Sequence, residues 1–255
     1  MTPFGLRNKN GSCWINAALQ AIFRIPEIQQ RLNDDETETP VESCLAEIWG
    51  SRGDEGLKAF FECVKVSSQL PAGEDIGDSH ELIEFLCDKI PSLDKLMRFK
   101  VVNKISCLNC PFTLHQNDTL TEFSITPNHP KQLVSDAITE AVKPTTIDDW
   151  KCDECSKRGC TKQLFITEFP DVLMFHHTST DTTTSYTPVI VMNKIRYALF
   201  SIVCFTGRHW FTWGRDLPPG KPWYRFDDQH VQSHSAAFMP HDDRMRLLMY
   251  YRLKE

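Results

Sequence analysis

The chain has 255 residues, enough for one large domain or two small ones, and it can bury a sizeable core without disulfides. A hydrophobic content of 41%, a charged content of 24%, 11 glycines and 15 prolines are ordinary values for a folded protein, which excludes a disordered or collagen-like chain. The net charge of -6 makes nucleic acid an unlikely partner. Because no long apolar run occurs, at residues 1–7 or elsewhere, we expect no membrane partner and a soluble protein of the cytoplasm or nucleus, which we expect to be monomeric.

Helices are predicted for the first third of the chain. Apolar residues recur there at the three- and four-residue spacing that places them on one face of a helix. The repeating positions are Trp14, Ala17, Ala18, Ala21 and Ile22, then Leu45, Ile48 and Trp49, then Leu57, Phe60, Phe61 and Val64, and finally Leu82, Phe85, Leu86 and Ile90. We expect these helices to end at Pro26, Pro40, Gly53, Pro71 and Pro91.

Strands are predicted for most of the chain beyond about residue 99, where apolar residues alternate or form short β-branched and aromatic runs. The expected strands are residues 101–105, 163–169, 172–176, 195–205, 210–213, 223–226 and 247–253. One short helix is expected at residues 133–142, and the threonine-rich residues 178–187 are expected to form a surface loop. Helices first and antiparallel strands afterwards predict an α+β protein.

Cys13 lies at the start of the first predicted helix, directly after Ser12. Ser12 is expected to cap this helix, which makes Cys13 its first residue. The free N–H groups and the dipole of a helix N-terminus stabilise a thiolate, which is the reactive form of cysteine. A cysteine at such a position can equally be a small buried residue. The amide of Asn8, five residues earlier, could stabilise an oxyanion, although a turn is the simpler interpretation.

Asp78 and Glu81 stand ahead of an apolar run that begins at Leu82. Their spacing is that of a capping box, in which the first side chain caps the helix and the second reaches back to it. This structural role is sufficient by itself to explain both residues.

His209 and Asp227 are expected to meet at one end of a β-hairpin. If residues 210–214 and 223–226 pair as antiparallel strands, the histidine before the first strand lies beside the aspartate after the second. An imidazole and a carboxylate together supply the general base, and the group that fixes its tautomer, that a nucleophilic cysteine needs. The alternatives are a buried core histidine and a turn made by the two aspartates.

Four of the ten cysteines form two Cys-x-x-Cys pairs, Cys107 with Cys110 and Cys152 with Cys155. Each pair has the spacing that lets one turn offer two thiolates to zinc, so together they predict one closed, structural Zn²⁺ site. Cys160 could replace one of the four ligands. A redox role is less favoured because no thioredoxin-like pattern surrounds either pair. With no open coordination position, the metal would organise the structure only, and no catalytic cofactor is expected.

Four segments, in order along the chain, resemble the ubiquitin-specific proteases. Residues 5–20 resemble their cysteine box, usually G-L-x-N-x-G-N-T-C-Y-x-N-x-x-L-Q, and residues 207–228 resemble their histidine box, G-H-Y followed by W-Y-x-F-D-D. Residues 78–82 resemble the D-x-x-E segment between the boxes, and the paired cysteines resemble the finger subdomain. The likeness therefore covers most of the chain.

The resemblance implies a papain-like fold that cleaves ubiquitin or a ubiquitin-like modifier after its C-terminal glycine. It implies a single catalytic domain, residues 1–255, with a helical thumb at about 1–98, zinc-bearing β fingers at 99–170 and an antiparallel β palm at 171–255. Ubiquitin or a relative, and the proteins to which it is attached, are the expected partners.

Residue by residue, the resemblance assigns roles to nine side chains. For catalysis, it makes Cys13 the nucleophile, His209 the base, Asp227 the carboxylate that orients the base, Asn8 the oxyanion donor and Asp228 a second polar group of the site. For substrate binding, it implies that Asp78 and Glu81 face arginines of the modifier's tail and that Arg208 and Trp210 border that tail.

The sequence departs from the family's pattern around these residues. Asn10-Gly11-Ser12 replaces Gly-Asn-Thr, Trp14 replaces a tyrosine, and Arg208 stands where a glycine usually precedes the histidine. Two alternatives follow. The chain could be a non-catalytic ubiquitin-binding module in which Arg208 obstructs the tail channel, or an adaptor organised by zinc, which would leave the two boxes unexplained.

Overall fold

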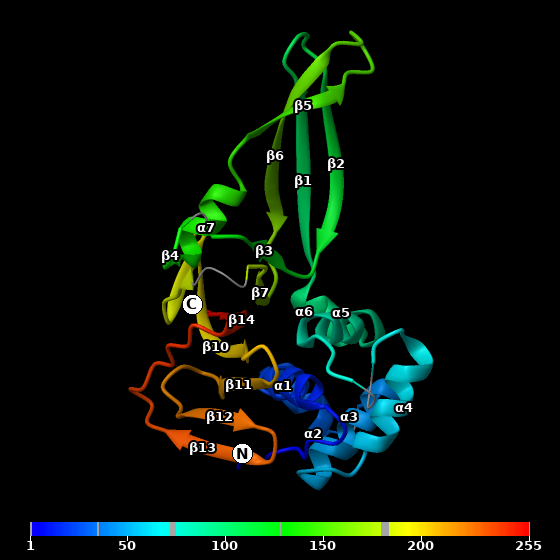
Figure 1. The fold of residues 1–255 in the computed structure, drawn as a ribbon, viewed down its shortest axis with the longest axis vertical. Coiled ribbons are helices and arrows are strands. Elements are labelled where there is room, and N and C mark those ends of the chain that lie inside the picture. The colour runs from blue at the N-terminus through cyan, green and yellow to red at the C-terminus, as the bar shows by residue number, and fades with distance from the viewer. Residues whose placement is uncertain (1, 35, 72–74, 128, 180–183, 255) are drawn as a thin grey trace.

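The structure is a computed structural model that describes residues 2–34, 36–71, 75–127, 129–179 and 184–254. Helices fill the N-terminal part and strands most of the remainder, which confirms the α+β prediction (Figure 1). The helices are α1 (Cys13–Ile22), α2 (Pro26–Asn33), α3 (Pro40–Ser51), α4 (Leu57–Ser67), α5 (Ser79–Lys89), α6 (Pro91–Met97) and α7 (Val134–Ala141). Within the described residues, no helix combines the length and apolar character that crossing a bilayer requires.

Three prolines have a different role from the predicted one. Pro26, Pro40 and Pro91 are the first residues of α2, α3 and α6, not the ends of the helices before them. A proline suits the first turn because its missing N–H would have no partner there and its fixed φ angle matches the helix. The preceding helices end before these prolines, as predicted, but the start of a new helix at each proline was not predicted.

The strands form two large sheets and one small one. They are β1 (Phe99–Cys107), β2 (Thr113–Leu120), β3 (Phe123–Ile125), β4 (Gln132–Leu133), β5 (Thr145–Lys151), β6 (Arg158–Glu168), β7 (Val172–His177), β8 (Thr184–Ser185), β9 (Val189–Met192), β10 (Ile195–Phe205), β11 (Trp210–Arg215), β12 (Trp223–Asp227), β13 (His230–His234) and β14 (Met245–Arg252). One sheet has the order β2-β1-β6-β5, and the other has the order β13-β12-β11-β10-β14-β7-β3 with β9 beside β10.

The predicted loop at residues 178–187 is only partly described. Residues 180–183 lie outside the described residues, and Thr184–Ser185 forms the short strand β8, which pairs with β4. The two-stranded β4–β8 sheet therefore replaces part of the predicted loop.

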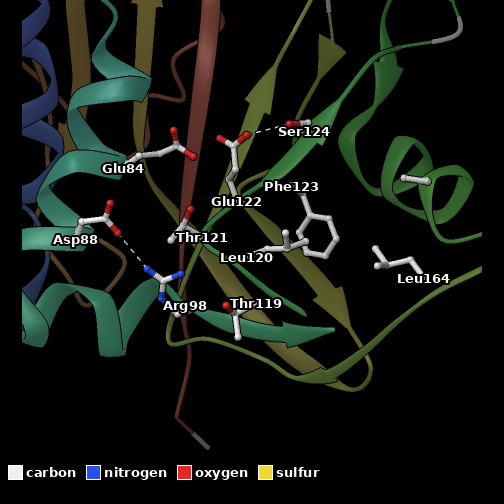
Figure 2. A pocket seen from close by; sticks show the side chains of 11 residues that line it. Glu84, Asp88, Arg98, Thr119, Leu120, Thr121, Glu122, Phe123, Ser124 and Leu164 are labelled. Carbon is white, nitrogen blue, oxygen red and sulfur yellow. Dashed lines mark hydrogen bonds and ion pairs between the residues drawn. The ribbon is translucent and has the colours of Figure 1, made fainter. Parts of the chain in front are cut away.

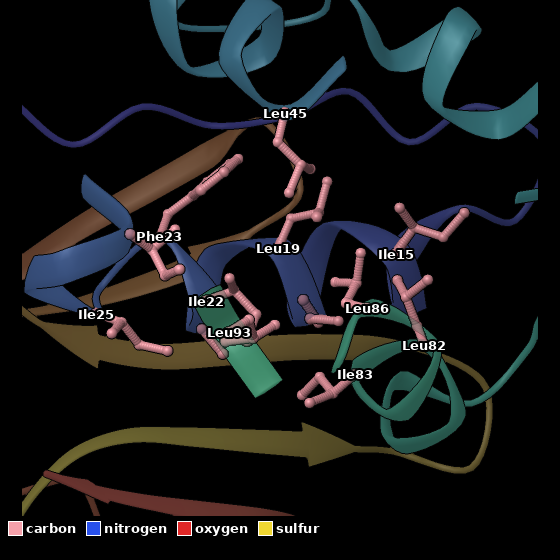
Figure 3. Close-up of a cluster of buried hydrophobic side chains, with 14 of the residues drawn as sticks. Ile15, Leu19, Ile22, Phe23, Ile25, Leu45, Leu82, Ile83, Leu86 and Leu93 are labelled. Atoms are coloured by element: carbon pink, nitrogen blue, oxygen red, sulfur yellow. The ribbon is translucent and has the colours of Figure 1, made fainter. Parts of the chain in front are cut away.

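Helix α1 is the centre of the thumb core. All ten of its residues are buried, and Figure 3 shows Ile15, Leu19 and Ile22 packed among side chains of the neighbouring helices. Two buried hydroxyls bind carbonyls of α1 from opposite sides: Ser79 Oγ on α5 donates to Trp14 O at 2.8 Å, and Thr212 Oγ1 on β11 donates to Ala17 O at 2.7 Å. The helix is thus fixed between the other helices and the larger sheet.

The four-stranded sheet extends away from the rest of the molecule as two long hairpins (Figure 1). Its central strand β1 pairs with β2 up to Ser106↔Thr113 and with β6 up to Cys107↔Cys160. These registers bring the two Cys-x-x-Cys segments together at the end of the hairpins, far from the thumb.

Candidate active site

His209 and Asp227 meet at one end of the β11–β12 hairpin. The two strands pair antiparallel from Thr212↔Phe226 to Arg215↔Trp223, which confirms the predicted pairing. His209 Nε2 lies 2.6 Å from Asp227 Oδ1, a short hydrogen bond that leaves the other ring nitrogen, Nδ1, to face a reacting group. The backbone of His209 is held by a tight turn, because its N–H donates to Thr206 Oγ1 at 3.0 Å and its carbonyl accepts from Thr206 N–H at 2.9 Å.

Asp227 has a second partner that the sequence interpretation missed. Arg225 places its guanidinium 2.8 Å from Asp227 Oδ2. Residues two apart on a strand share a face, so this pairing follows from the strand geometry once β12 is recognised. Arg225 therefore holds the carboxylate from the side opposite His209.

Asp228 lies next to the pair and binds two asparagines. Asn8 Nδ2 donates to Asp228 Oδ2 at 3.0 Å, and Asn16 Nδ2 donates to Asp228 Oδ1 at 2.8 Å. Asp228 Oδ2 is 3.9 Å from His209 Nε2, compared with 2.6 Å for Asp227. Asp227 is therefore the direct partner of the histidine, and Asp228 connects it to the N-terminal part of the chain. Asn16, one turn after Cys13 on α1, was not predicted to belong to the site.

Cys13 is the first residue of α1, as predicted, and is 2% exposed. Ser12 occupies the N-cap position, but its hydroxyl accepts from Lys9 N–H at 2.9 Å and does not cap the helix. Burial raises the pKa of the Cys13 thiol above its usual value, whereas the main-chain N–H groups of Trp210, Trp14 and Cys13 itself act in the opposite direction. The thiol thus rests in its protonated form at neutral pH and needs a base.

A close backbone approach joins the N-terminal segment to the turn after β12. Leu6 N–H donates to Asp228 O at 3.0 Å. A Cβ atom added to Gly5 would overlap the main-chain carbonyl of Gln229, so only glycine fits at this point. This contact explains the glycine and places Asn8 beside Asp228.

A cavity of about 520 Å³ lies between the thumb and the palm. Asp78 and Glu81, at the start of α5, line one side, and Trp210 lines the other. Asp78 caps α5 by accepting from His80 N–H at 2.8 Å, as predicted, and Glu81 is exposed. Arg208 is exposed on the turn before β11 and is not among the described residues that line this cavity.

A polar cluster, which we call the clasp, connects α5 to the sheet and consists of His80, Glu122 and His176. The imidazoles of His80 and His176 stack with their centroids 4.0 Å apart, and both bind the carboxylate of Glu122. The ligand atoms of the three residues lie within 4.8 Å of one another, close enough for a metal ion, and the same atoms form the ion pairs just described. The clasp was not predicted.

A second cavity, of about 600 Å³, lies at the base of the fingers. Figure 2 shows this cavity with Asp88 paired to Arg98 and Glu122 bonded to Ser124. His176 lines the first cavity and Glu122 the second.

The four predicted metal ligands come together at the end of the four-stranded sheet. Sγ of Cys107 is 3.7 Å from Sγ of Cys155, and Sγ of Cys110 is 3.7 Å from Sγ of Cys152. Four sulfurs at about 2.3 Å from a tetrahedral zinc ion lie about 3.8 Å apart. The Asn109 N–H also donates to Cys107 Sγ at 3.3 Å, as it would to a metal-bound thiolate. The donor set and its geometry therefore fit a structural zinc ion.

Comparison with known proteins gives a family and a fold. The family model described as ubiquitin carboxyl-terminal hydrolase matches residues 4–250. No curated protein sequence matches the chain. The structure is similar to a chain of the SAGA DUB module Ubp8/Sgf11/Sus1/Sgf73 bound to monoubiquitin, with a TM-score of 0.82 and 18% identity, covering 98% of this chain and 69% of that chain. For the same module bound to ubiquitin aldehyde, the TM-score is 0.80 and the sequence identity is 17%. That match covers 98% of this chain and 70% of the other chain.

Proposed function

Because the chain belongs to the ubiquitin carboxyl-terminal hydrolase family, we propose that it is a cysteine-dependent isopeptidase that cleaves ubiquitin or a ubiquitin-like modifier after its C-terminal glycine. The observation that carries this proposal is the 2.6 Å hydrogen bond between His209 and Asp227, next to Asp228, to which Asn16, one turn after Cys13 on α1, donates at 2.8 Å. Cys13 and the hairpin that carries His209 and Asp227 lie far apart in the sequence. Their convergence is the arrangement that thiol acyl transfer requires.

The proposed reaction uses each group in turn. His209 takes the thiol proton, and Cys13 Sγ attacks the carbonyl carbon of the glycine. The tetrahedral oxyanion is stabilised by main-chain N–H groups at the start of α1 and by the amide of Asn8. His209 then returns the proton to the departing lysine amine, which leaves a thioester, and the same histidine activates the water that hydrolyses it. Asp227 keeps the imidazole in one orientation throughout.

Zinc and the acidic side chains have supporting roles in this proposal. One Zn²⁺ held by Cys107, Cys110, Cys152 and Cys155 would stabilise the fingers and take no part in the reaction. Asp78 and Glu81 would bind basic side chains of the modifier's tail across the cleft. The fold itself supports binding of ubiquitin, because the similar modules were captured with monoubiquitin and with ubiquitin aldehyde.

Covalent trapping tests the proposal. A ubiquitin probe with a C-terminal electrophile should add one ubiquitin mass to the wild-type protein and none to Cys13→Ala. Cys63→Ala is the matched control, because Cys63 is a partly exposed free thiol away from the site, and it should be labelled like the wild type. A wild-type protein that binds ubiquitin-family probes and reacts with none of them would instead support the non-catalytic binding module.

A further inference from the structure

A basic pocket lies at the end of the larger sheet that is farther from the cleft. Its volume is about 520 Å³, and four basic side chains, Lys194, Arg196, Arg252 and Lys254, line it together with the carboxylate of Asp171. Strand β10 begins in this pocket and ends in the cleft, so roughly 30 Å of extended chain separates the two. The basic pocket is therefore distinct from the candidate active site.

Main-chain hydrogen bonds hold the walls of the basic pocket in place. The Arg252 N–H donates to the carbonyl of Asp171 at 2.8 Å, and the Leu253 N–H donates to the carbonyl of Arg196 at 2.8 Å. These two bonds join the segment before β7, the start of β10 and the end of β14. The basic side chains thus start from a fixed backbone, which lowers the entropy cost of binding a ligand between them.

The positive charges of the basic pocket are largely uncompensated. Arg252 and Asp171 approach only to 4.0 Å and are 41% and 43% exposed, so this pair is weak. Within the part of the chain that the structure describes, Lys194, Arg196 and Lys254 have no ion pair and no side-chain hydrogen bond. Like charges that share a pocket repel one another, and a bound anion would remove this repulsion.

The turn that carries Lys194 has an unfavourable residue choice. Asn193 and Lys194 connect β9 to β10, with Met192 paired to Ile195, and their φ angles are 46° and 68°. Positive φ at both central residues is the type I′ pattern, in which glycine is preferred because other residues are disfavoured there. Since Lys194 is exposed, burial of its side chain does not explain the choice. Residues in such disfavoured conformations cluster at functional sites.

A phosphate group suits these side chains better than a carboxylate does. At pH 7 it carries nearly two negative charges and three acceptor oxygens, whereas a carboxylate has one charge and two oxygens. A guanidinium binds phosphate through two parallel hydrogen bonds, and a lysine adds a point charge. A single pocket on a chain of net charge -6 is not the extended basic stripe that is typical of nucleic-acid binding.

We propose that Lys194, Arg196, Arg252 and Lys254 bind a phosphate group, carried either by a small molecule or by a phosphorylated side chain of a partner protein. The site is separate from the cleft and does not depend on the proposed function. Lys194 then gives up stability in its turn for the sake of binding, and this trade can be measured.

Calorimetric titration of the whole chain with pyrophosphate at low salt tests the site. Lys194→Gly and Arg196→Gln should each raise Kd about tenfold, the effect of one lost charge-assisted contact. Lys194→Gly should also melt at a higher temperature than wild type, because glycine suits the turn, so its weaker binding cannot come from misfolding. Asn193→Gly is the matched control: it places glycine in the same turn but removes no charge, and its Kd should stay within about twofold of wild type.

A peptide with one phosphoserine, compared with its unphosphorylated form, identifies the source of the phosphate. Tighter binding of the phosphopeptide than of pyrophosphate supports a site for a modified protein, and the reverse supports a site for a small phosphate compound. Equal affinity of wild type, Lys194→Gly and Arg196→Gln for both ligands, or no binding of either ligand by wild type, overturns the proposal. A DNA duplex that binds more tightly than both ligands, and loses affinity in the same variants, also overturns it and indicates a nucleic-acid surface.

Discussion

Asn16, one turn after Cys13 on α1, donates its side-chain amide to Asp228 Oδ1 at 2.8 Å. The same nitrogen lies 3.3 Å from the carbonyl of Leu6 and 3.2 Å from that of Arg7. One side chain thus connects the helix that carries the thiol, the N-terminal segment and the turn that follows Asp227. The relative position of thiol and imidazole depends on this connection.

Replacing Asn16 by alanine should reduce both stability and turnover. The substitution leaves two carbonyls and one carboxylate oxygen without this donor, so we expect a loss of about 1–3 kcal/mol in unfolding free energy and about a tenfold lower kcat. Gln20→Ala is the control, because Gln20, also on α1, donates to Phe4 O at 2.8 Å but does not reach Asp228. Urea unfolding and steady-state kinetics should show a similar loss of stability in both variants and a loss of kcat in Asn16→Ala alone.

The two neighbouring aspartates should differ strongly in their effect on catalysis. Asp227→Asn removes the carboxylate that binds His209 Nε2, so kcat should fall by about 10²- to 10⁴-fold. Asp228→Asn keeps an oxygen for one asparagine and leaves the Asp227 bond intact, so kcat should fall less than about tenfold. Both are isosteric changes measured on the same substrate. A larger loss in the Asp228 variant would make Asp228 the orienting residue.

Glu122→Gln should weaken the clasp between α5 and the sheet, and it should change how the stability of the protein depends on pH. Burial raises the pKa of Glu122, but the bonds and charges of His176 and His80 lower it by more, to about 2. Burial lowers the pKa of His80. The negative charges of Glu122, Glu84 and Asp78 raise this pKa by more, so that it lies above the usual value for histidine. Each shift means that folding favours the charged form of that group.

The sign of the pH effect follows from these two directions. The Glu122 contribution is fully present above about pH 4.5 and is lost as the pH falls toward 2. The His80 contribution is fully present below about pH 6.5 and is lost as the pH rises through the raised pKa. Thermal unfolding from pH 4 to 9 should therefore show the greatest difference between wild type and Glu122→Gln at about pH 5–6. A difference that is constant over this range would exclude an ionic clasp.

Removal of one cysteine of the finger cluster should abolish metal binding. The purified protein should contain one zinc ion per chain, and Cys152→Ser should contain close to none and melt at a lower temperature, because metal affinity is part of the folding free energy. Cys160→Ala is the control, because Cys160 is buried beside Cys107 in the β1–β6 register but does not belong to the cluster. Elemental analysis that finds zinc unchanged in Cys152→Ser would refute the site.

The parts of the fold that bury one face were predictable. Helices α1, α3, α4 and α5 and strands β7, β10 and β14 have periodic apolar residues because one side of each faces a core. By contrast β2 and β5 are almost entirely exposed, so their sequences carry no such pattern, and neither was predicted. They are strands because β1 and β6 offer them unpaired edges.

The identities of the main site residues could be predicted from the sequence, but most of the contacts between them could not. Cys13, His209 and Asp227 could be named because they lie in recognisable segments and because a hairpin brings His209 and Asp227 to one end. Asn16 and the clasp depend on tertiary packing between segments about 40 to more than 200 residues apart, which no local pattern encodes.

The double anchoring of α1 also limits how the molecule can be divided. Phe200, Val203, Leu247 and Met249 of the sheet share one core with the helix, so a fragment that stops before β1 would present that apolar surface to water. Such a truncation should aggregate. The shortest product that stays in solution therefore has to extend through β14.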